Sequence, residues 1–260
     1  MDHHNLHETS HAVNYFDGEI EQAAGARLRQ LAVNPDSPAT AAAIDEIIRW
    51  LTIKQCAHAH REGLYFEHAE PHMARQWNDV IWPVIKNEDH THTLELACGH
   101  GRNTEFLRRF ARTIDLVDVN ESCVEACRQR FGSEKDGCVF RYHVTSGMIL
   151  PVGDETVTFG YSWDSMVHFD KLVVQDYVRE FARVLKPGGT AFLHHSNYGE
   201  VAPNSNWASN HGNRSDMTAG LMRDYARQSG LSMKFQRLSG LADGWGIEDL
   251  DCLSLLRKPL

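Results

Sequence analysis

The sequence predicts an α/β fold with a doubly wound, mainly parallel sheet, preceded by a helical extension. Three observations lead to this prediction. From Thr93 onward, short apolar segments alternate with amphipathic ones, as in strands joined by crossover helices. A pair of glycines follows the first apolar segment, at the point where a helix is expected to begin. Residues 1–87 show mainly helical spacing of their apolar side chains.

The extension is expected to contain four helical segments. A turn at Asn34–Ser37 separates the first two, Pro71 breaks the third, and Pro83 is expected to stop the fourth. We assign residues 1–87 to this extension and residues 88–260 to the α/β domain. The four segments are Ile20–Ala32, Ala39–Cys56, Ala57–Ala69 and Met73–Ile85.

The α/β domain is expected to begin with a buried strand around Leu94 and Leu96, followed by a helix over Asn103–Ala111. A turn at Pro187-Gly188-Gly189 leads into the fifth strand. The later strands are expected at Ile114–Val119, Val139–Val144, Val157–Trp163 and Thr190–His194. The later helices are expected at Ser122–Phe131, Val173–Leu185 and Met217–Ser229, before a hairpin-like pair of strands at Ser232–Leu238 and Cys252–Arg257.

Composition narrows the class of protein and its partners. The 260 residues are 42% hydrophobic and 23% charged, and no apolar run approaches the ~20 residues that span a bilayer. The N-terminus lacks the basic and apolar parts of a secretion signal, so we expect a cytoplasmic protein with no membrane partner. The formal net charge of -9 argues against a nucleic-acid partner, because phosphate contacts need clustered Lys and Arg.

Cysteine and histidine usage bears on metal binding. The six cysteines form neither a Cys-x-x-Cys pair nor a zinc-like spacing, which indicates reduced thiols. Four of the sixteen histidines lie within residues 1–11, where a solvated tail is the expected structure. We expect no resident metal ion, although Asp164, His194, His195 and Asn197 could gather one.

The segment Glu95-Leu-Ala-Cys-Gly99-His-Gly101 has the chemistry of a ligand cradle. Glycines lack the Cβ atoms that would keep a ligand away from the backbone, and the following helix presents unpaired N–H groups. Glu95 precedes the glycines at a place where it would repel a phosphate and attract a cationic amino group.

This segment resembles the first motif of class I S-adenosylmethionine-dependent methyltransferases, roughly E/D-x-G-x-G-x-G, with Ala97 in place of the first glycine. The run from Phe181 to Gly189, Phe-Ala-Arg-Val-Leu-Lys-Pro-Gly-Gly, is similar to a later helix and turn of the same family. The resemblance extends from Thr93 to about Asn197. It implies a Rossmann-like sheet and S-adenosylmethionine as the cofactor.

The resemblance also implies which residues hold the cofactor. Glu95 would bind the ammonium group, while Gly99 and Gly101 allow close approach. Asn120 stands where an acid usually binds the two ribose hydroxyls, with Asp118 as the competing candidate. The remaining predicted cofactor residues are Ser146, Gly147 and Met148 near the adenine, and Trp163 at the end of the fourth strand.

The acceptor is expected beyond the carboxyl ends of the strands, where open α/β sheets bind ligands. A hydroxyl acceptor must lose a proton, and histidine is suited to take it because its pKa is near working pH. His168 or His195 is therefore predicted as the base, with Asp164 orienting it or the acceptor. Strand alternation sends His194 and His195 to opposite sides, so at most one of them is expected at the acceptor.

The sequence thus predicts an O-methyltransferase for a small polar acceptor, either sugar-like or a secondary metabolite. The long polar loop Tyr198–Ser215, with Trp207, His211 and Arg214, suits a hydroxylated molecule. Two alternatives stay open: an N-methyltransferase that acts on a small amine, and a non-catalytic protein that binds S-adenosylmethionine. A homo-oligomer is possible.

Overall fold

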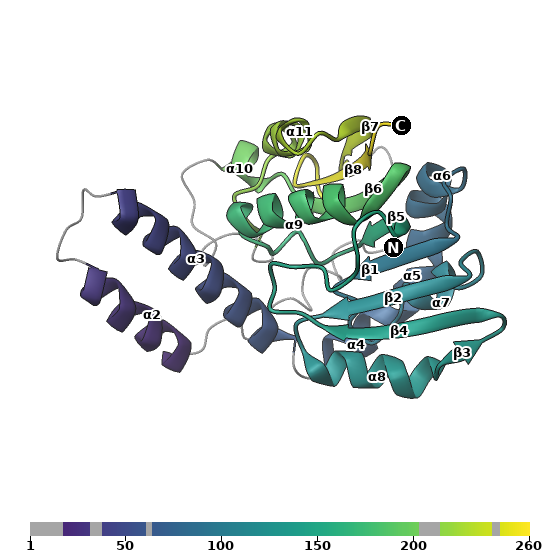
Figure 1. The fold of residues 1–260 in the computed structure, drawn as a ribbon, viewed down its shortest axis with the longest axis horizontal. Coiled ribbons are helices and arrows are strands. Elements are labelled where there is room, and N and C mark those ends of the chain that lie inside the picture. The colour runs from purple at the N-terminus through teal and green to yellow at the C-terminus, as the bar shows by residue number, and fades with distance from the viewer. Residues whose placement is uncertain (1–17, 32–37, 61–63, 203–213, 241–244) are drawn as a thin grey trace.

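A computed structural model describes residues 18–31, 38–60, 64–202, 214–240 and 245–260. Within these residues one eight-stranded sheet forms, in the order β3-β4-β2-β1-β5-β6-β8-β7 (Figure 1). The five strands from β4 to β6 are parallel, whereas β3, β8 and β7 pair antiparallel with their neighbours. The strands are β1 His92–Leu96, β2 Thr113–Asp118, β3 Glu134–Lys135, β4 Cys138–Val144, β5 Val157–Ser162, β6 Leu185–Ser196, β7 Ser232–Leu238 and β8 Asp251–Arg257. This is the predicted doubly wound, Rossmann-like α/β architecture, with the last pair of strands arranged as expected.

Helices occupy the chain before β1 and the crossovers between the strands. In Figure 1, α2 and the first half of α3 extend away from the sheet, while the end of α3 reaches the domain. Before β1 lie α2 Gly18–Leu31, α3 Pro38–Ala59, α4 Leu64–Ala69, η2 Glu70–His72, α5 Met73–Gln76, η3 Trp77–Ile81 and α6 Trp82–Ile85. After β1 lie α7 Thr104–Leu107, α8 Glu121–Phe131, α9 Lys171–Val184, α10 Tyr198–Val201 and α11 Ala219–Gln228.

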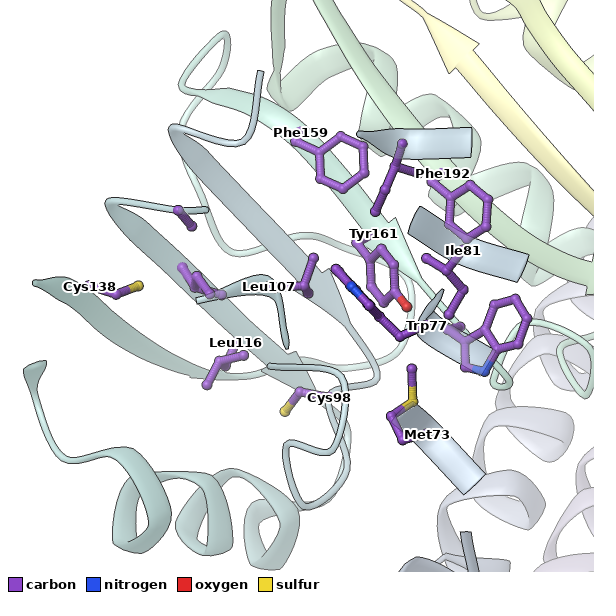
Figure 2. Close-up of a cluster of buried hydrophobic side chains, with 14 of the residues drawn as sticks. Met73, Trp77, Ile81, Cys98, Leu107, Leu116, Cys138, Phe159, Tyr161 and Phe192 are labelled. Carbon is purple, nitrogen blue, oxygen red and sulfur yellow. The ribbon is translucent and has the colours of Figure 1, made fainter. Parts of the chain in front are cut away.

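Two apolar cores hold helices against opposite faces of the sheet. On one face, Leu116, Phe159 and Phe192 pack in a cluster with Trp77 and Ile81 from the extension (Figure 2). On the other face, the alternate strand positions meet the buried sides of α9 and α11. The extension is therefore part of the main core near β1, and the division at residue 87 stays a prediction.

The structure corrects two local predictions. Pro83 does not end its helix, because it lies in the first turn of α6, where a missing N–H is tolerated, directly after the π-helical turn η3. The Pro187-Gly188-Gly189 turn lies within β6 instead of before it. Val157 pairs with Leu185 and Phe159 with Thr190, so the turn is an irregularity in that strand pair.

Of the helices in the described residues, none is long and apolar enough to cross a membrane. Because β1, β2 and β5 are parallel neighbours, their carboxyl ends lie at the same edge of the sheet. Open α/β sheets bind ligands beyond this edge.

Candidate functional site

A cavity lies at this edge, and the end of α3 contributes part of its wall. The strand ends provide Leu96–Gly99, Asp118–Asn120 and Trp163–Asp164. The other wall includes residues of α3, from Thr52 to Ala57, and His60 just after it. Segments far apart in the sequence thus line one partly open cavity.

The glycine turn explains why the backbone comes close to this cavity. Gly99 has φ 52°, and a Cβ placed on it would lie 2.5 Å from Cε1 of Phe66. Gly101 has φ 79°, but it does not line the cavity, and its missing Cβ makes room for Phe131 of α8. Gly99 therefore shapes the ligand side of the turn, whereas Gly101 allows close helix packing. Ala97, the departure from the family motif, also has a positive φ, of 57°.

Glu95 is a buried carboxyl behind the turn. Its Oε2 accepts a hydrogen bond from Oγ1 of Thr104 at 2.6 Å, whereas its Oε1 has no hydrogen-bond partner in the described part of the chain. Burial raises the pKa of Glu95 to about 8, although Thr104 and nearby arginines lower it. Glu95 is not in the cavity wall itself, but an incompletely satisfied buried carboxyl is suited to a cationic group.

Asp118 ends β2 and lines the cavity. Its two carboxylate oxygens accept hydrogen bonds from the backbone N–H groups of Gly99, at 3.0 Å, and Asn120, at 2.9 Å. Burial raises its pKa above the usual range. The side chain of Asn120 instead donates to the carbonyl oxygen of Ala57 at 3.0 Å and so holds the end of α3. Of the two predicted ribose ligands, Asp118 has the carboxylate with further lone pairs, while Asn120 fixes the cover of the cavity.

The predicted adenine residues are placed unequally. Gly147 lines the cavity with φ 99°, and a Cβ on it would lie 2.6 Å from Cγ2 of Ile53 on α3. Ser146 is exposed, Met148 is half-buried, and neither belongs to the cavity wall. Of these three residues after β4, Gly147 therefore shapes the cavity, because its missing Cβ lets α3 approach.

At the other end of the cavity, Asp164 pairs with Arg102 at 2.7 Å. Burial would raise the pKa of Asp164, but the charge of Arg102 outweighs it and the pKa is lowered. Asp164 has φ 59°, and its backbone N–H donates to Nδ1 of His194 at 3.0 Å. Asp164 thus stays a carboxylate that fixes Arg102, and it is not suited to act as a base.

The two predicted histidine bases lie in different surroundings. His168 is buried and lines the cavity beside Asp164. His195 does not line it: its Nδ1 donates to the carbonyl oxygen of Ser196, and its Nε2 accepts from Ser254, both at 2.9 Å. Burial lowers the pKa of His195 to about 4. The prediction of His195 as a base is corrected, because the register of β6 turns its ring toward β8.

Sequence reasoning missed the residues that distant segments bring to this end. His60 follows α3, and its ring centroid lies 5.8 Å from that of His168. Phe66 covers Gly99, and its ring stacks on that of His100. The only signal in the sequence was a group of histidines in the third helical segment of the extension, which indicates no direction for any of them.

The other predicted acceptor features lie apart from the cavity or outside the described residues. Arg214 pairs with Asp251 through two hydrogen bonds of 2.8 and 2.9 Å, whereas Trp207 and His211 lie outside the described residues. Trp163 stays in the cavity wall, and its ring centroid is 4.4 Å from that of His194. Among the residues that the structure describes, no group of three or more His, Cys, Asp or Glu side chains is arranged to hold a metal ion.

Comparison with known proteins agrees with this geometry. A protein family described as a methyltransferase domain matches residues 93–189, which run from β1 to the turn in β6. Residues 93–189 are thus similar to a methyltransferase domain, in agreement with the resemblance of this segment to class I methyltransferases. S-adenosylmethionine is the cofactor of that class.

Two curated relatives match part of this chain. The methyltransferase GfsG of Streptomyces halstedii is 30% identical over 97 residues, and the O-methyltransferase cnsE of Penicillium expansum is 26% identical over 98. Each match covers 37% of this chain. It covers 34% of GfsG and 35% of cnsE, so the chain spans about a third of the length of these relatives.

Solved structures share the fold of the methyltransferase domain. An S-adenosylmethionine-dependent methyltransferase from Clostridium acetobutylicum has a TM-score of 0.58 at 16% identity, over 75% of this chain and 98% of that one. The [4+2]-cyclase SpnF has a TM-score of 0.53 at 17% identity, over 76% and 84%. Because the cyclase SpnF has the same fold, the fold alone does not determine the reaction.

Proposed function

We propose that this protein transfers a methyl group from S-adenosylmethionine to a hydroxyl group of a small molecule. The observation that carries the proposal is the pair of buried carboxyl groups, Glu95 and Asp118, on either side of the glycine turn. Both have raised pKa values, and Oε1 of Glu95 has no hydrogen-bond partner among the described residues. An ammonium group and a vicinal diol are chemically suited to these two acceptors.

The residues in and behind the cavity wall fit the parts of the cofactor that the family motif assigns to them. Asp118 would accept hydrogen bonds from the ribose hydroxyls, and Glu95 would compensate the ammonium charge. Gly99 and Gly147 keep the wall free of side chains where Phe66 and Ile53 cover it. When bound, S-adenosylmethionine supplies a methyl group activated by a sulfonium. The chain itself binds and orients the cofactor and the acceptor, and it excludes water from them.

The acceptor is proposed to lie at the end of the cavity formed by Trp163, Asp164 and His168. A hydroxyl loses its proton during transfer, and an imidazole at this end is suited to take it. At this end of the cavity the charges of Arg102 and Asp164 already compensate each other in an ion pair. Since Phe66, Trp163 and Phe169 also line the cavity, we favour a largely apolar secondary metabolite over a sugar.

The name of one relative, an O-methyltransferase, supports transfer to oxygen. An N-methyltransferase acting on a small amine is the alternative, because a neutral amine needs little help from a base. A protein that binds S-adenosylmethionine without catalysis is the second alternative. It would never form the demethylated product.

Calorimetry with S-adenosylmethionine tests the cofactor site, with Gly99→Ala and Gly132→Ala as a matched pair. Both glycines have positive φ, of 52° and 67°, so an alanine is strained at each position. A Cβ at Gly132 meets nothing within 4 Å, whereas a Cβ at Gly99 would clash with Phe66, which lines the cavity. We expect Gly99→Ala alone to lose affinity, by about tenfold or more, the equivalent of about 1.4 kcal/mol.

Failure of the unsubstituted protein to bind S-adenosylmethionine would overturn the proposal. Equal affinity of the two alanine variants would place the ligand elsewhere. A screen of phenols, alcohols and amines for formation of the demethylated cofactor then separates the three functions. Product with amines alone would indicate N-methylation, and binding without product from any acceptor would indicate a non-catalytic protein.

A further inference from the structure

We propose that His60, supplied by the helical extension, is the general base that removes the proton of the acceptor hydroxyl. The inference rests on the proposed function and names the proton acceptor of the same site. It gives the extension a chemical role in addition to covering the cofactor. The family match begins at residue 93 and so does not include this residue.

The position of His60 is fixed by α3, which it follows, and by hydrogen bonds from Asn120 and Cys123. It directly follows α3, lines the cavity, and faces His168 at a centroid distance of 5.8 Å. Its own carbonyl oxygen accepts hydrogen bonds from Nδ2 of Asn120, at 3.5 Å, and from Sγ of Cys123, at 3.8 Å. These contacts attach the end of α3 to the beginning of α8, beside the carboxyl end of β2.

The hydrogen bond of the imidazole determines which nitrogen is basic. Nδ1 of His60 lies 2.8 Å from the carbonyl oxygen of Cys56, one turn earlier in α3. A carbonyl oxygen only accepts hydrogen bonds, so Nδ1 carries the proton of the neutral ring. Nε2 is then the nitrogen with the lone pair. In His194 the roles are reversed, because its Nδ1 accepts from the backbone of Asp164.

The surroundings keep the ring neutral and still stabilise its charged form during the reaction. Burial lowers the pKa of His60, and the nearby charge of Arg102 lowers it further. The hydrogen bond to Cys56 and the charge of Asp164 act in the opposite direction without reversing the shift. At neutral pH the ring is therefore ready to accept a proton, and the carboxylate of Asp164 compensates part of the charge that results.

The O–H bond of the acceptor breaks, and its proton moves to Nε2 of His60. The acceptor oxygen forms a bond to the methyl carbon, while the bond from that carbon to sulfur breaks and its electron pair stays on sulfur. The imidazolium then returns the proton to solvent.

The test uses 4-nitrophenol, whose anion is yellow and whose neutral form is colourless. It is added at about pH 6 to the full chain saturated with the demethylated cofactor, so that proton transfer is observed without turnover. We compare the unsubstituted protein with His60→Gln, His168→Gln and His68→Gln. His68 is the matched control, because it is an exposed histidine on α4 outside the cavity wall.

We expect the anionic fraction of bound 4-nitrophenol in the unsubstituted protein and in His68→Gln to exceed that of free 4-nitrophenol at the same pH. In His60→Gln the ratio of anionic to neutral bound phenol should fall by about tenfold or more, the effect of a one-unit rise in the apparent pKa of the bound phenol. A loss in His168→Gln but not in His60→Gln would overturn the proposal in favour of His168. An absence of the yellow form in every protein would also overturn it.

Two further measurements separate this inference from the proposed function and from misfolding. Calorimetry with S-adenosylmethionine should give the same affinity for His60→Gln as for the unsubstituted protein. If the unsubstituted protein does not bind S-adenosylmethionine, the proposed function fails, and not only the role of His60. Nitrogen-15 spectra of the full chain, with the His60 signals assigned from His60→Gln, should show a neutral ring protonated on Nδ1 at neutral pH. A proton on Nε2 would overturn the proposal.

Discussion

Two buried aspartates on the same strand, Asp115 and Asp118, lie in opposite electrostatic surroundings. Asp115 accepts hydrogen bonds from Nε2 of His92, at 2.5 Å, and Nε2 of His143, at 2.7 Å. Burial would raise its pKa, but the two imidazoles outweigh that effect and lower it to about 2. Asp118, three residues later, accepts from backbone N–H groups, and burial raises its pKa.

The difference indicates which carboxylate serves the fold and which is available to a ligand. A buried carboxylate is costly unless cations or hydrogen bonds compensate it, and Asp115 has two such imidazole partners. Asp118 and Glu95 keep raised pKa values at the edge of the sheet that forms the cavity. Incompletely compensated carboxyl groups of this kind concentrate at functional sites.

The largest expected effect is on cofactor affinity in Asp118→Ala. This variant removes two acceptors for the ribose hydroxyls, and each hydrogen bond to a charged group contributes about 1.5–3 kcal/mol. We expect the dissociation constant for S-adenosylmethionine to rise by about 100-fold or more in calorimetry. A change of less than about threefold would show that Asp118 does not hold the ribose, and attention would return to Asn120.

Asp115→Asn should have the complementary effect, on stability alone. The folded-state pKa of Asp115, about 2, lies below its reference value of 3.8, so its stabilising contribution is present above pH 3.8 and is lost as pH falls through about 2. At neutral pH, urea unfolding of Asp115→Asn should show a loss of about 1–3 kcal/mol. Its affinity for S-adenosylmethionine should stay within about twofold. A matched loss of affinity would show that the two aspartates are not independent.

The fold could be predicted from the sequence because its signals are local. The apolar segments of β1 and β2, the glycine turn and the helix of α8 each depend on residues close together in the chain. The proposed cofactor residues depend on the same local signals, since Glu95, Gly99 and Asp118 lie near the ends of two strands. Our proposal of Asp118 over Asn120 depends on the structure, because Asn120 donates a hydrogen bond to the main chain of Ala57, 63 residues away.

The acceptor side could not be predicted, because tertiary contacts create it. His60 reaches the cavity only because α3 passes over the edge of the sheet, and no spacing in the sequence encodes that path. His194 and His195 show the limit of pattern reasoning. Alternation correctly separates their sides, but only the pairing of β6 with β8 reveals that His195 bonds to Ser254.

The smallest expected effect is the release of a proton from Glu95, the other buried carboxyl group with a raised pKa, when the cofactor binds. With a pKa of about 8, Glu95 is mostly protonated at pH 7, and a bound ammonium group would lower that pKa and ionise it. Calorimetry in buffers with different ionisation enthalpies should therefore detect up to about 0.9 proton released per cofactor at pH 7. Glu95→Gln is the isosteric control, and the difference between the two proteins cancels proton exchange by the cofactor itself. If the two release the same number of protons, Glu95 does not meet the ammonium group, and the cation must be compensated from another part of the cavity.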